Sequence, residues 1–267
     1  MDRIAWDGYL FSQPDSAFYF AQLQYDYAEK KGIQKHMAEA LNVQAISFTL
    51  RGELIQAINL FKQSLKIQQE IGNKQAVASV SNNLGNVYRR QGNYAKAIDY
   101  QLKALKIREE IGKKKDISSS LNNIGGIYGD QGELTKSLDF FQRALKICEE
   151  IGYKKGTGSA LNNMGEIYMK QQNYVKALEL HMRSLKLKEE SNDKRGIGFS
   201  LNNIGTIYEK LGEYEKALNF STQSLRIREE IGDKLGIANC LNIIGRVHKQ
   251  QGNLIQALDF QSKALSL

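Results

Sequence analysis

The sequence repeats itself with a period of 40 residues. The segment 121–125 reads Leu-Asn-Asn-Ile-Gly, and closely similar segments follow at 161–165 and 201–205. Looser copies lie at 81–85 and 241–245. A fixed period of about 20 to 50 residues is typical of solenoid proteins, in which each unit buries its apolar face only against its neighbours. We therefore expect an extended array of small units instead of a globule built around one pocket.

Each repeat reads as two helices. The apolar residues of its first half fall on one face of a helix between 117 and 131, namely Leu121, Ile124, Gly125 and Tyr128. A second stripe at helical spacing contains Ser137, Leu138, Phe141, Ala144, Leu145 and Ile151. Glycines that can adopt positive φ follow the two stripes, at Gly132 and Gly152. The pattern predicts two antiparallel helices per repeat, here called the first and the second helix, joined by a tight turn.

One glycine lies inside the first helix. A glycine there costs about 1 kcal/mol relative to alanine, yet Gly125 has counterparts one or more periods away at Gly85, Gly165, Gly205 and Gly245. Positions related in this way, by multiples of 40 residues, are called a column below. The recurrence predicts that two helices cross at this column so closely that a side chain would not fit.

These residues resemble the tetratricopeptide pattern, in which Leu-x-x-Leu-Gly-x-x-Tyr is followed by small-x-x-aromatic-x-x-Ala. The usual repeat of that family has about 34 residues and a proline after the second helix, whereas this chain has longer repeats that end in Glu-Glu-Ile-Gly. In this respect it is similar to the longer-helix group found in kinesin light chain, LGN-type polarity adaptors and bacterial signalling proteins. The resemblance implies an all-α fold, a right-handed superhelical α-solenoid with a concave groove lined mainly by first helices.

The period divides the chain into frames. A degenerate unit at 1–40 is followed by an array at 41–267, with frames 41–80, 81–120, 121–160, 161–200, 201–240 and 241–267. Together they predict about seven helix-turn-helix hairpins. In the degenerate unit Met1, Ile4 and Ala5 occupy the Leu, Ile and Gly columns, residues 17–32 read as the second helix, and Pro14 precedes its start.

The C-terminal frame ends without a polar cap. Solenoid ends normally present a polar outer face, but Leu254, Leu258 and Leu265 continue the internal apolar pattern. We expect this chain to be part of a longer protein. The alternative is self-association through the uncapped C-terminal helix.

The net charge of +8 does not by itself indicate a nucleic-acid partner. Only the frame 81–120 is locally basic, with nine Lys and Arg against four Asp and Glu. Most charges belong to second-helix runs of alternating sign, such as 106–110, which are typical of a solvated face. A continuous basic stripe is absent, so nucleic-acid binding is not expected. If it occurred, it would depend on Arg89, Arg90 and 113–115.

No set of residues indicates catalysis. His181 and His248 fall in the columns of Phe141 and Tyr128, so both are predicted to pack in the core, while His36 is placed in a connector. Cys148 shares its column with charged residues and is therefore predicted to be exposed: Arg108, Lys188 and Arg228. The glycines match no phosphate-binding loop. We predict that the chain is not an enzyme and has no catalytic residue, no cofactor and no metal ion.

The chain shows no apolar run long enough to span a membrane and no leader segment. Its two cysteines, Cys148 and Cys240, lie in different repeats and give no disulfide framework. Neither observation determines a compartment. We favour the cytoplasm, and a periplasmic sensor region of a bacterial protein is the alternative.

The asparagine pairs are the candidate binding residues. An amide side chain both donates and accepts hydrogen bonds, which suits contact with the backbone of an extended peptide. One asparagine column and its variable neighbours form the predicted peptide-binding set: Asn83, Asn123, Asn163, Asn203, Arg90, Glu166, Lys170, Lys210 and Arg246. In peptide-holding members of the family that the chain resembles, an asparagine of this column makes the contact. The rival interpretation is structural, with asparagines bonding from frame to frame.

Two functions remain open from the sequence. The first is a non-enzymatic interaction module that binds a protein partner, as a peptide or a helix, in the concave groove. The second is the sensor or regulatory region of a larger signalling protein, such as a histidine kinase or a nucleotide cyclase, whose catalytic part lies elsewhere.

Overall fold

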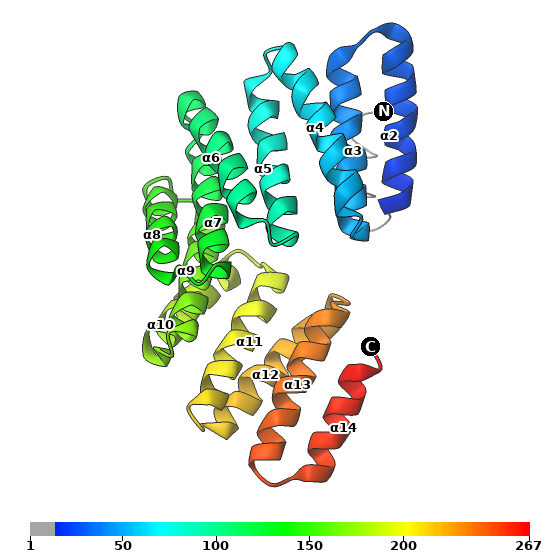
Figure 1. Ribbon diagram of the computed structural model, residues 1–267. Coiled ribbons are helices and arrows are strands. Elements are labelled where there is room, and N and C mark those ends of the chain that lie inside the picture. Colours follow the sequence, from blue (N-terminus) through cyan, green and yellow to red (C-terminus); the bar gives the residue numbers. More distant parts are fainter. Residues whose placement is uncertain (1–13) are drawn as a thin grey trace. The chain divides into compact units, whose positions relative to one another are not determined.

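The computed structural model describes residues 14–267, and within them all regular structure is helical (Figure 1). Helices begin at intervals of 20 residues, and the thirteen that lie in this range are α2 Pro14–Lys31, α3 Gln34–Arg51, α4 Leu54–Glu70, α5 Lys74–Arg90, α6 Tyr94–Ile111, α7 Lys114–Asp130, α8 Leu134–Glu150, α9 Lys154–Lys170, α10 Tyr174–Glu190, α11 Lys194–Lys210, α12 Tyr214–Glu230, α13 Lys234–Gln250 and α14 Leu254–Leu265. The predicted all-α array of helical hairpins is confirmed.

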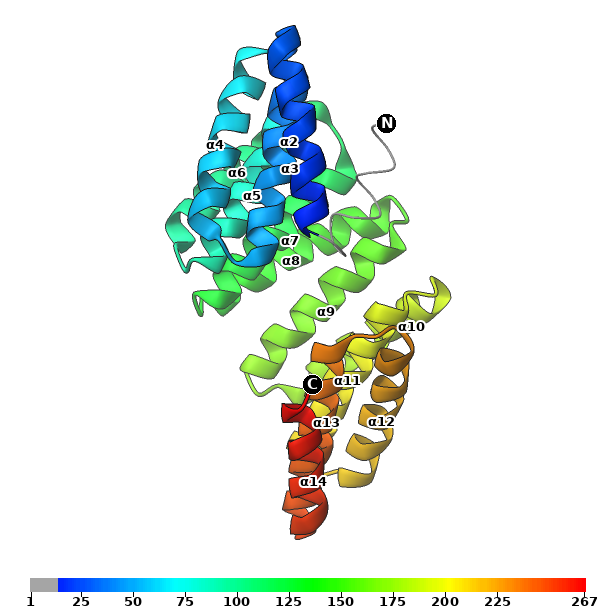
Figure 2. The same cartoon turned by 90° about the vertical axis from the view of Figure 1, so that its right-hand side faces the viewer.

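The chain divides into two compact units, which are described separately. The first contains α2 to α7, and the second, from residue 133 onward, contains α8 to α14. In the first unit α3 packs on α4 and α5 on α6. In the second unit the hairpins are α9–α10, α11–α12 and α13–α14, and both views show α13 and α14 side by side (Figures 1 and 2). The first helices also touch directly, α3 to α5, α5 to α7 and α11 to α13.

The degenerate N-terminal unit is only partly covered. Its predicted second helix corresponds to α2, which begins at Pro14, a position where the missing N–H of proline has no intrahelical partner to lose. Met1, Ile4 and Ala5 lie outside the described residues.

Positive-φ residues separate successive helices. One recurs every 20 residues, and ten of the twelve are glycines: 32, 52, 72, 92, 112, 132, 152, 212, 232 and 252. The predicted helix-ending glycines Gly132 and Gly152 are among them, with φ of 81° and 64°. The exceptions are Gln172 and Asn192, which flank α10. In several turns the next residue is an Asn or Asp that accepts a hydrogen bond from the N–H three residues later, as Asn73 does from Ala76 at 3.2 Å. Each such turn therefore ends one helix and caps the next.

The core of each unit lies between first and second helices. Phe61, Leu84 and Val87 are among the buried residues of the first unit, and Leu161 and Ile204 of the second. At the end of the first helix an aromatic ring stacks on one from the second helix: Tyr88 on Tyr100, Tyr208 on Phe220 and His248 on Phe260. His248 therefore takes the place of a tyrosine in the stack, as its column predicted.

The recurrent glycine marks the helix crossing in each described hairpin where its surroundings are given. A Cβ atom at Gly165 would lie 2.7 Å from His181 Nε2, and one at Gly85 would lie 2.8 Å from Gln101 Cγ. At Gly245 the backbone oxygen of Ala257 would be 3.3 Å away. These distances are shorter than ordinary van der Waals contacts, so the predicted close crossing is confirmed at these positions.

The placement of His36 in a connector is wrong. Gly32 adopts a φ of 66°, which ends α2, and α3 already begins at Gln34. His36 therefore lies in the first turn of α3, where Nδ1 is 2.9 Å from Glu39 Oε2. The connector is shorter than the sequence suggested because a single left-handed residue reverses the chain.

Two glycines of α9 provide a test of the crossing. Gly165→Ala places a methyl group against the buried ring of His181, so we expect it to lower the free energy of unfolding by about 1–3 kcal/mol. Gly158 has only ordinary contacts at 3.8 Å or more, so Gly158→Ala should raise it by about 0.5–1 kcal/mol. Urea unfolding of the two variants measures both changes. Equal effects would show that α9 and α10 do not cross at Gly165.

Candidate functional site

Adjacent first helices in the first unit are joined by side chains 41 residues apart. Asn83 Nδ2 donates to Asn42 Oδ1 at 3.2 Å, and Asn123 Nδ2 donates to Asn82 Oδ1 at 2.8 Å. Two arginines bond with the same offset: Arg90 Nη1 donates to the backbone oxygen of Thr49 at 2.9 Å, and Arg89 Nε donates to Asp130 Oδ2 at 2.5 Å. An offset of one repeat plus one residue therefore fixes how α3, α5 and α7 lie beside each other.

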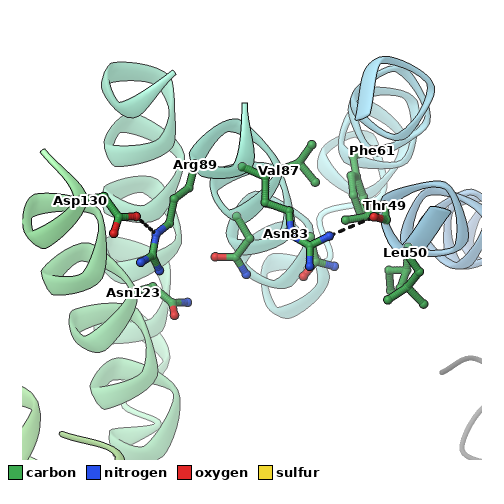
Figure 3. A pocket seen from close by; sticks show the side chains of 11 residues that line it. Thr49, Leu50, Phe61, Asn83, Val87, Arg89, Asn123 and Asp130 are labelled. Atoms are coloured by element: carbon green, nitrogen blue, oxygen red, sulfur yellow. Dashed lines mark hydrogen bonds and ion pairs between the residues drawn. The ribbon is translucent and has the colours of Figure 1, made fainter. Parts of the chain in front are cut away.

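A pocket of about 550 Å³ opens over these three helices (Figure 3). Its lining comes from α3, α5 and α7 with one residue of α4: Ile46, Thr49, Leu50, Phe61, Asn83, Asn86, Val87, Arg89, Arg90, Asn123 and Asp130. Gly126 makes room within it, because a Cβ there would lie 2.8 Å from Arg89 Nη1. The absence of a side chain at Gly126 thus lets the Arg89 guanidinium reach Asp130.

The pocket combines apolar surface with polar groups that can still bind. Leu50 is 39% exposed and supplies apolar contact area. Arg90 is exposed, and a guanidinium has five N–H donors, so its bond to Thr49 leaves donors for a ligand. The side chains of Arg89 and Asp130 are about one-third exposed and largely neutralise each other. Amides, one available guanidinium and an apolar patch suit an extended peptide better than a small charged metabolite.

The second unit has a smaller pocket of about 350 Å³ over α11 and α13. It is lined by Asn202, Thr206, Asn239, Asn242, Ile243, Arg246 and Gln261. Arg246 donates two hydrogen bonds to the buried carboxylate of Glu209, at 2.9 and 2.6 Å. These bonds raise the pKa of the Arg246 guanidinium, and the two charges largely offset each other. The remaining polar lining consists mainly of the amides of Asn202, Asn239, Asn242 and Gln261.

Glu166 lies on α9 with its carboxylate largely out of water. Asn162 Nδ2 donates to Glu166 Oε1 at 3.0 Å. Burial is the main influence on this carboxyl and raises its pKa, although the Asn162 bond and the charge of Lys170 act in the opposite direction. Lys170 and Lys210 themselves are exposed, at the last residues of α9 and α11.

The structure thus brings together only part of the predicted peptide-binding set. Asn83, Asn123 and Arg90 line one pocket in the first unit, whereas Arg246 lines the pocket of the second. Asn163 and Asn203 are partly buried on α9 and α11. Asn83 and Asn123 both bond from frame to frame. A role of the set in binding stays a prediction.

The expectation that Cys148 is exposed is wrong. Its column is buried: Cys148 is fully buried, and Arg108 and Arg228 are 8% and 6% exposed. Charged residues in this column suggested a solvated face, but this turn of the second helix meets the next first helix in α6–α7 and α12–α13. The charges are tolerated because the next first helix, or the residue that caps it, supplies their hydrogen-bond partners.

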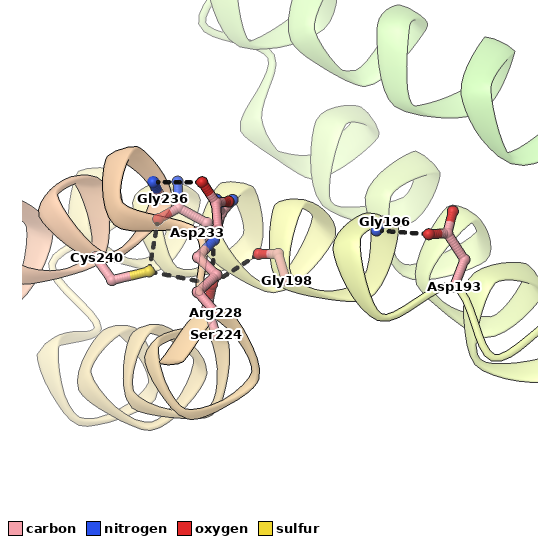
Figure 4. Close-up of polar contacts among 9 residues, drawn as sticks. Asp193, Gly196, Gly198, Ser224, Arg228, Asp233, Gly236 and Cys240 are labelled. Carbon is pink, nitrogen blue, oxygen red and sulfur yellow. Dashed lines mark hydrogen bonds and ion pairs between the residues drawn. The ribbon is translucent and has the colours of Figure 1, made fainter. Parts of the chain in front are cut away.

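Arg228 shows how such a buried charge is satisfied (Figure 4). Its Nη1 pairs with Asp233 Oδ2 at 2.6 Å, and its Nε donates to Ser224 Oγ at 3.2 Å. The other carboxylate oxygen of Asp233 accepts from the N–H of Gly236 at 3.1 Å. A side chain at Gly236 would collide with the guanidinium. One aspartate therefore caps α13 and neutralises Arg228, while Cys240 Sγ lies 3.1 Å from Ser224 Oγ.

Two other members of the column use a serine of the following helix. Arg108 Nη1 donates to Ser120 Oγ at 2.7 Å, and Lys188 Nζ donates to Ser200 Oγ at 2.9 Å. Burial lowers the pKa of Arg108 and lowers that of Lys188 to about 8. These side chains therefore join a second helix to the first helix that follows it, α6 to α7 and α10 to α11.

His181 is a core residue, as predicted. It is fully buried against Gly165, and neither ring nitrogen has a hydrogen-bond partner within the protein. Burial, followed by the charge of Lys188, lowers the pKa of its imidazole to about 4. The ring is therefore neutral near pH 7. It packs in the core at the position that Phe61 occupies three periods earlier.

Several site residues escaped the sequence reasoning. Asn42, Thr49, Leu50 and Arg89 all line the pocket or bond within it. The signal that could have found the polar ones is the 41-residue spacing of complementary groups, an Asn after an Asn and an Asp after an Arg. Leu50 carries no such signal, because its exposure depends on how α3 lies against α5.

Acidification should weaken the fold through His181. The unfolded imidazole takes up a proton near pH 6.5, whereas the folded one resists it until about pH 4. The unfolded state thus binds more protons between these values, and stability falls as the pH drops. We expect the wild type to lose up to about 3 kcal/mol more than His181→Phe between pH 7 and pH 4.

Urea unfolding of both proteins at several pH values measures this difference. The comparison with His181→Phe is necessary because the raised pKa of Glu166 acts in the opposite direction in both proteins. Parallel stability curves would show that the imidazole is not buried in neutral form.

Comparison with known families agrees with this architecture. A sequence model of the tetratricopeptide repeat matches residues 36–110, 116–190, 156–230 and 196–267. These matches cover most of the chain, and the chain belongs to the tetratricopeptide repeat family. Among curated proteins, none matches it.

Solved structures share the fold at low sequence identity. BtubC (BKLC) from P. vanneervenii is 20% identical with a TM-score of 0.70, over 83% of this chain and 93% of that one. A Rap protein complexed with competence and sporulation factor is 14% identical, with a TM-score of 0.70 over 94% of this chain and 86% of that one. A signal transduction ATPase with numerous domains and a tetratricopeptide repeat sensor, from Pyrococcus horikoshii, is 20% identical, with a TM-score of 0.70 over 94% of this chain and 41% of that one.

Residues 14–267 were also considered for a membrane span and for a metal site. No helix in this range is long and apolar enough to cross a membrane. The same residues contain no group of three or more His, Cys, Asp or Glu side chains that could hold a metal ion.

Proposed function

We propose that this chain is a non-enzymatic interaction module that holds an extended segment of a protein partner on the exposed face of its first helices. The pocket over α3, α5 and α7 carries the proposal. Its polar lining repeats from helix to helix, which suits the repeating backbone of a peptide, and its variable residues Leu50 and Arg90 offer selective contacts. The Rap structure, described as a complex with competence and sporulation factor, supports the same use of the fold.

The absence of catalysis belongs to this proposal. His181 and His248 pack against neighbouring side chains, and Cys148 and Cys240 are buried. Titratable groups with shifted pKa values, such as Arg108 and Lys188, bond to a serine of the following helix. Such ion and hydrogen-bond networks shift pKa values without serving chemistry.

A second candidate is a sensor region within a larger signalling protein. The observation that favours it is the similarity to the Pyrococcus horikoshii ATPase, whose description includes a tetratricopeptide repeat sensor. In that case the groove would still bind a protein or peptide, and the binding would be read out by another domain. The coding sequence around this chain tests the idea, since it predicts a catalytic domain in the same reading frame.

Peptides selected from a random 12-residue library provide a test of the groove. Leu50→Glu puts a charge on the apolar patch of the pocket, so we expect it to weaken selected peptides about tenfold or more. Leu102→Glu is the matched control, because Leu102 is also exposed, at 44%, but lies on α6 outside the pocket. Fluorescence anisotropy measures both affinities. Equal affinities for the two variants would contradict binding in this pocket.

Asn123→Ala separates the two roles of the asparagine column. The variant loses the bond to Asn82, which should lower the free energy of unfolding by about 0.5–1.5 kcal/mol. If Asn123 also contacts the peptide backbone, as we propose, the Kd of a selected peptide should rise about two- to twelvefold. Lower stability with unchanged affinity would leave the column a purely structural feature. Asn122→Ala is the neighbouring control, since Asn122 bonds to Ser118 within its own helix.

A further inference from the structure

A second pocket of the first unit differs chemically from the pocket over α3, α5 and α7, which is called the groove pocket below. It has a volume of about 340 Å³ and is lined by residues of α4, α5 and α6. It shares no lining residue with the groove pocket. Its lining, called the lysine pocket below, consists of Lys62, Tyr88, Lys96, Asp99, Tyr100 and Lys103.

The three lysines keep their charges available. None of the ion pairs found in residues 14–267 involves them, although lysines elsewhere on the same helices are paired, such as Lys66 with Glu70. Lys96 Nζ lies 5.4 Å from the centre of the Tyr88 ring, which helps to hold that ammonium at the pocket. Burial raises the pKa of the Tyr100 phenol, and the nearby positive charge of Lys62 acts in the opposite direction. Three ammonium groups thus face one carboxylate, that of Asp99.

The repeat supplies an internal comparison. Three periods later the aromatic stack is retained, as Tyr208 on Phe220, and Lys216 lies over the Tyr208 ring at 5.3 Å. The columns of Lys62 and Lys103 hold Met182 and Gln223 there, and Lys216 is paired with Glu213 at 2.6 Å. The aromatic stack therefore forms without the two extra lysines, which are not needed for packing.

We propose that the lysine pocket is a second interaction site, which binds an acidic segment of a polypeptide partner through two or more carboxylates. Its charge and its size support this occupant, because three ammonium groups around 340 Å³ can pair with neighbouring Asp or Glu side chains on one strand. The site is independent of the groove, so it can bind whether or not the groove does.

A protein segment fits this pocket better than a nucleic acid. Phosphate backbones are bound by basic residues that continue along a track. One turn further along the same faces lie Lys66 and Lys106, but each is followed four residues later by a glutamate, Glu70 and Glu110, that offsets its charge, and Asp99 lies within the lining. The positive charge is therefore local, which matches a short acidic run.

Fluorescein-labelled hexaglutamate is the probe, and anisotropy at low and high salt is the measurement. The variant Lys62→Met/Lys103→Gln carries the residues that the chain itself has three periods later, so it should fold normally. Because exposed ion pairs are weak, we expect its affinity for hexaglutamate to fall about 2- to 30-fold. Added salt should weaken the wild type and bring the two proteins together.

The control changes the same charge on the same helices outside the pocket. Lys66→Met/Lys106→Gln alters α4 and α6 identically in charge, one turn outside the pocket lining, and should lose clearly less affinity than Lys62→Met/Lys103→Gln. Equal losses of affinity in the two double variants would show that only the net charge matters and would overturn the proposal. Hexaglutamate binding that neither variant weakens would overturn it too. A single-stranded oligonucleotide that binds more tightly than hexaglutamate and loses affinity in Lys62→Met/Lys103→Gln would overturn it in favour of nucleic acid. The groove variant Leu50→Glu should leave hexaglutamate binding unchanged, which separates this site from the groove.

Discussion

Within each hairpin the first and second helices meet at a residue without a side chain, and the arrangement of the other elements depends on this contact. Gly85, Gly165, Gly205 and Gly245 let a second-helix side chain lie directly against the backbone of the first helix. The small separation fixes where each first helix sits on its partner. In α5, α11 and α13 an aromatic stack at the helix end, such as Tyr88 on Tyr100, gives a second contact that sets the rotation of the first helix.

Neighbouring first helices are held in register by side-chain bonds between frames. In the first unit, pairs 41 residues apart place Asn83 and Asn123 in one row and bring Arg89 to Asp130. On the second helices, Arg108, Lys188 and Arg228 each bond to the first helix that follows or to its capping residue. Both sets hold the frames at a fixed spacing, which is the condition for a peptide backbone to meet the same kind of group at every repeat.

The period, the turns and the crossing glycines were predictable, because each depends on residues close together in sequence or repeated at a fixed distance. Gly132 ends a helix for a local reason, and His248 could be placed by the aromatic residues of its column. The burial of Cys148 was not predictable, because Arg228 in the same column is compensated by Asp233, which caps the following helix α13. Leu50 was missed for a similar reason: whether an apolar side chain stays exposed depends on the neighbouring helix and not on its own pattern.

Two residues other than glycine adopt positive φ, and both flank the same helix. Gln172 and Asn192 stand at the two ends of α10, where left-handed backbone is unfavourable for residues with a side chain. Between them, the same helix carries His181 with two buried nitrogens that lack partners. In a linear array each hairpin is stabilised only by its neighbours, so a weak member is not rescued by distant contacts. We therefore expect local opening of the second unit to be favoured at α10.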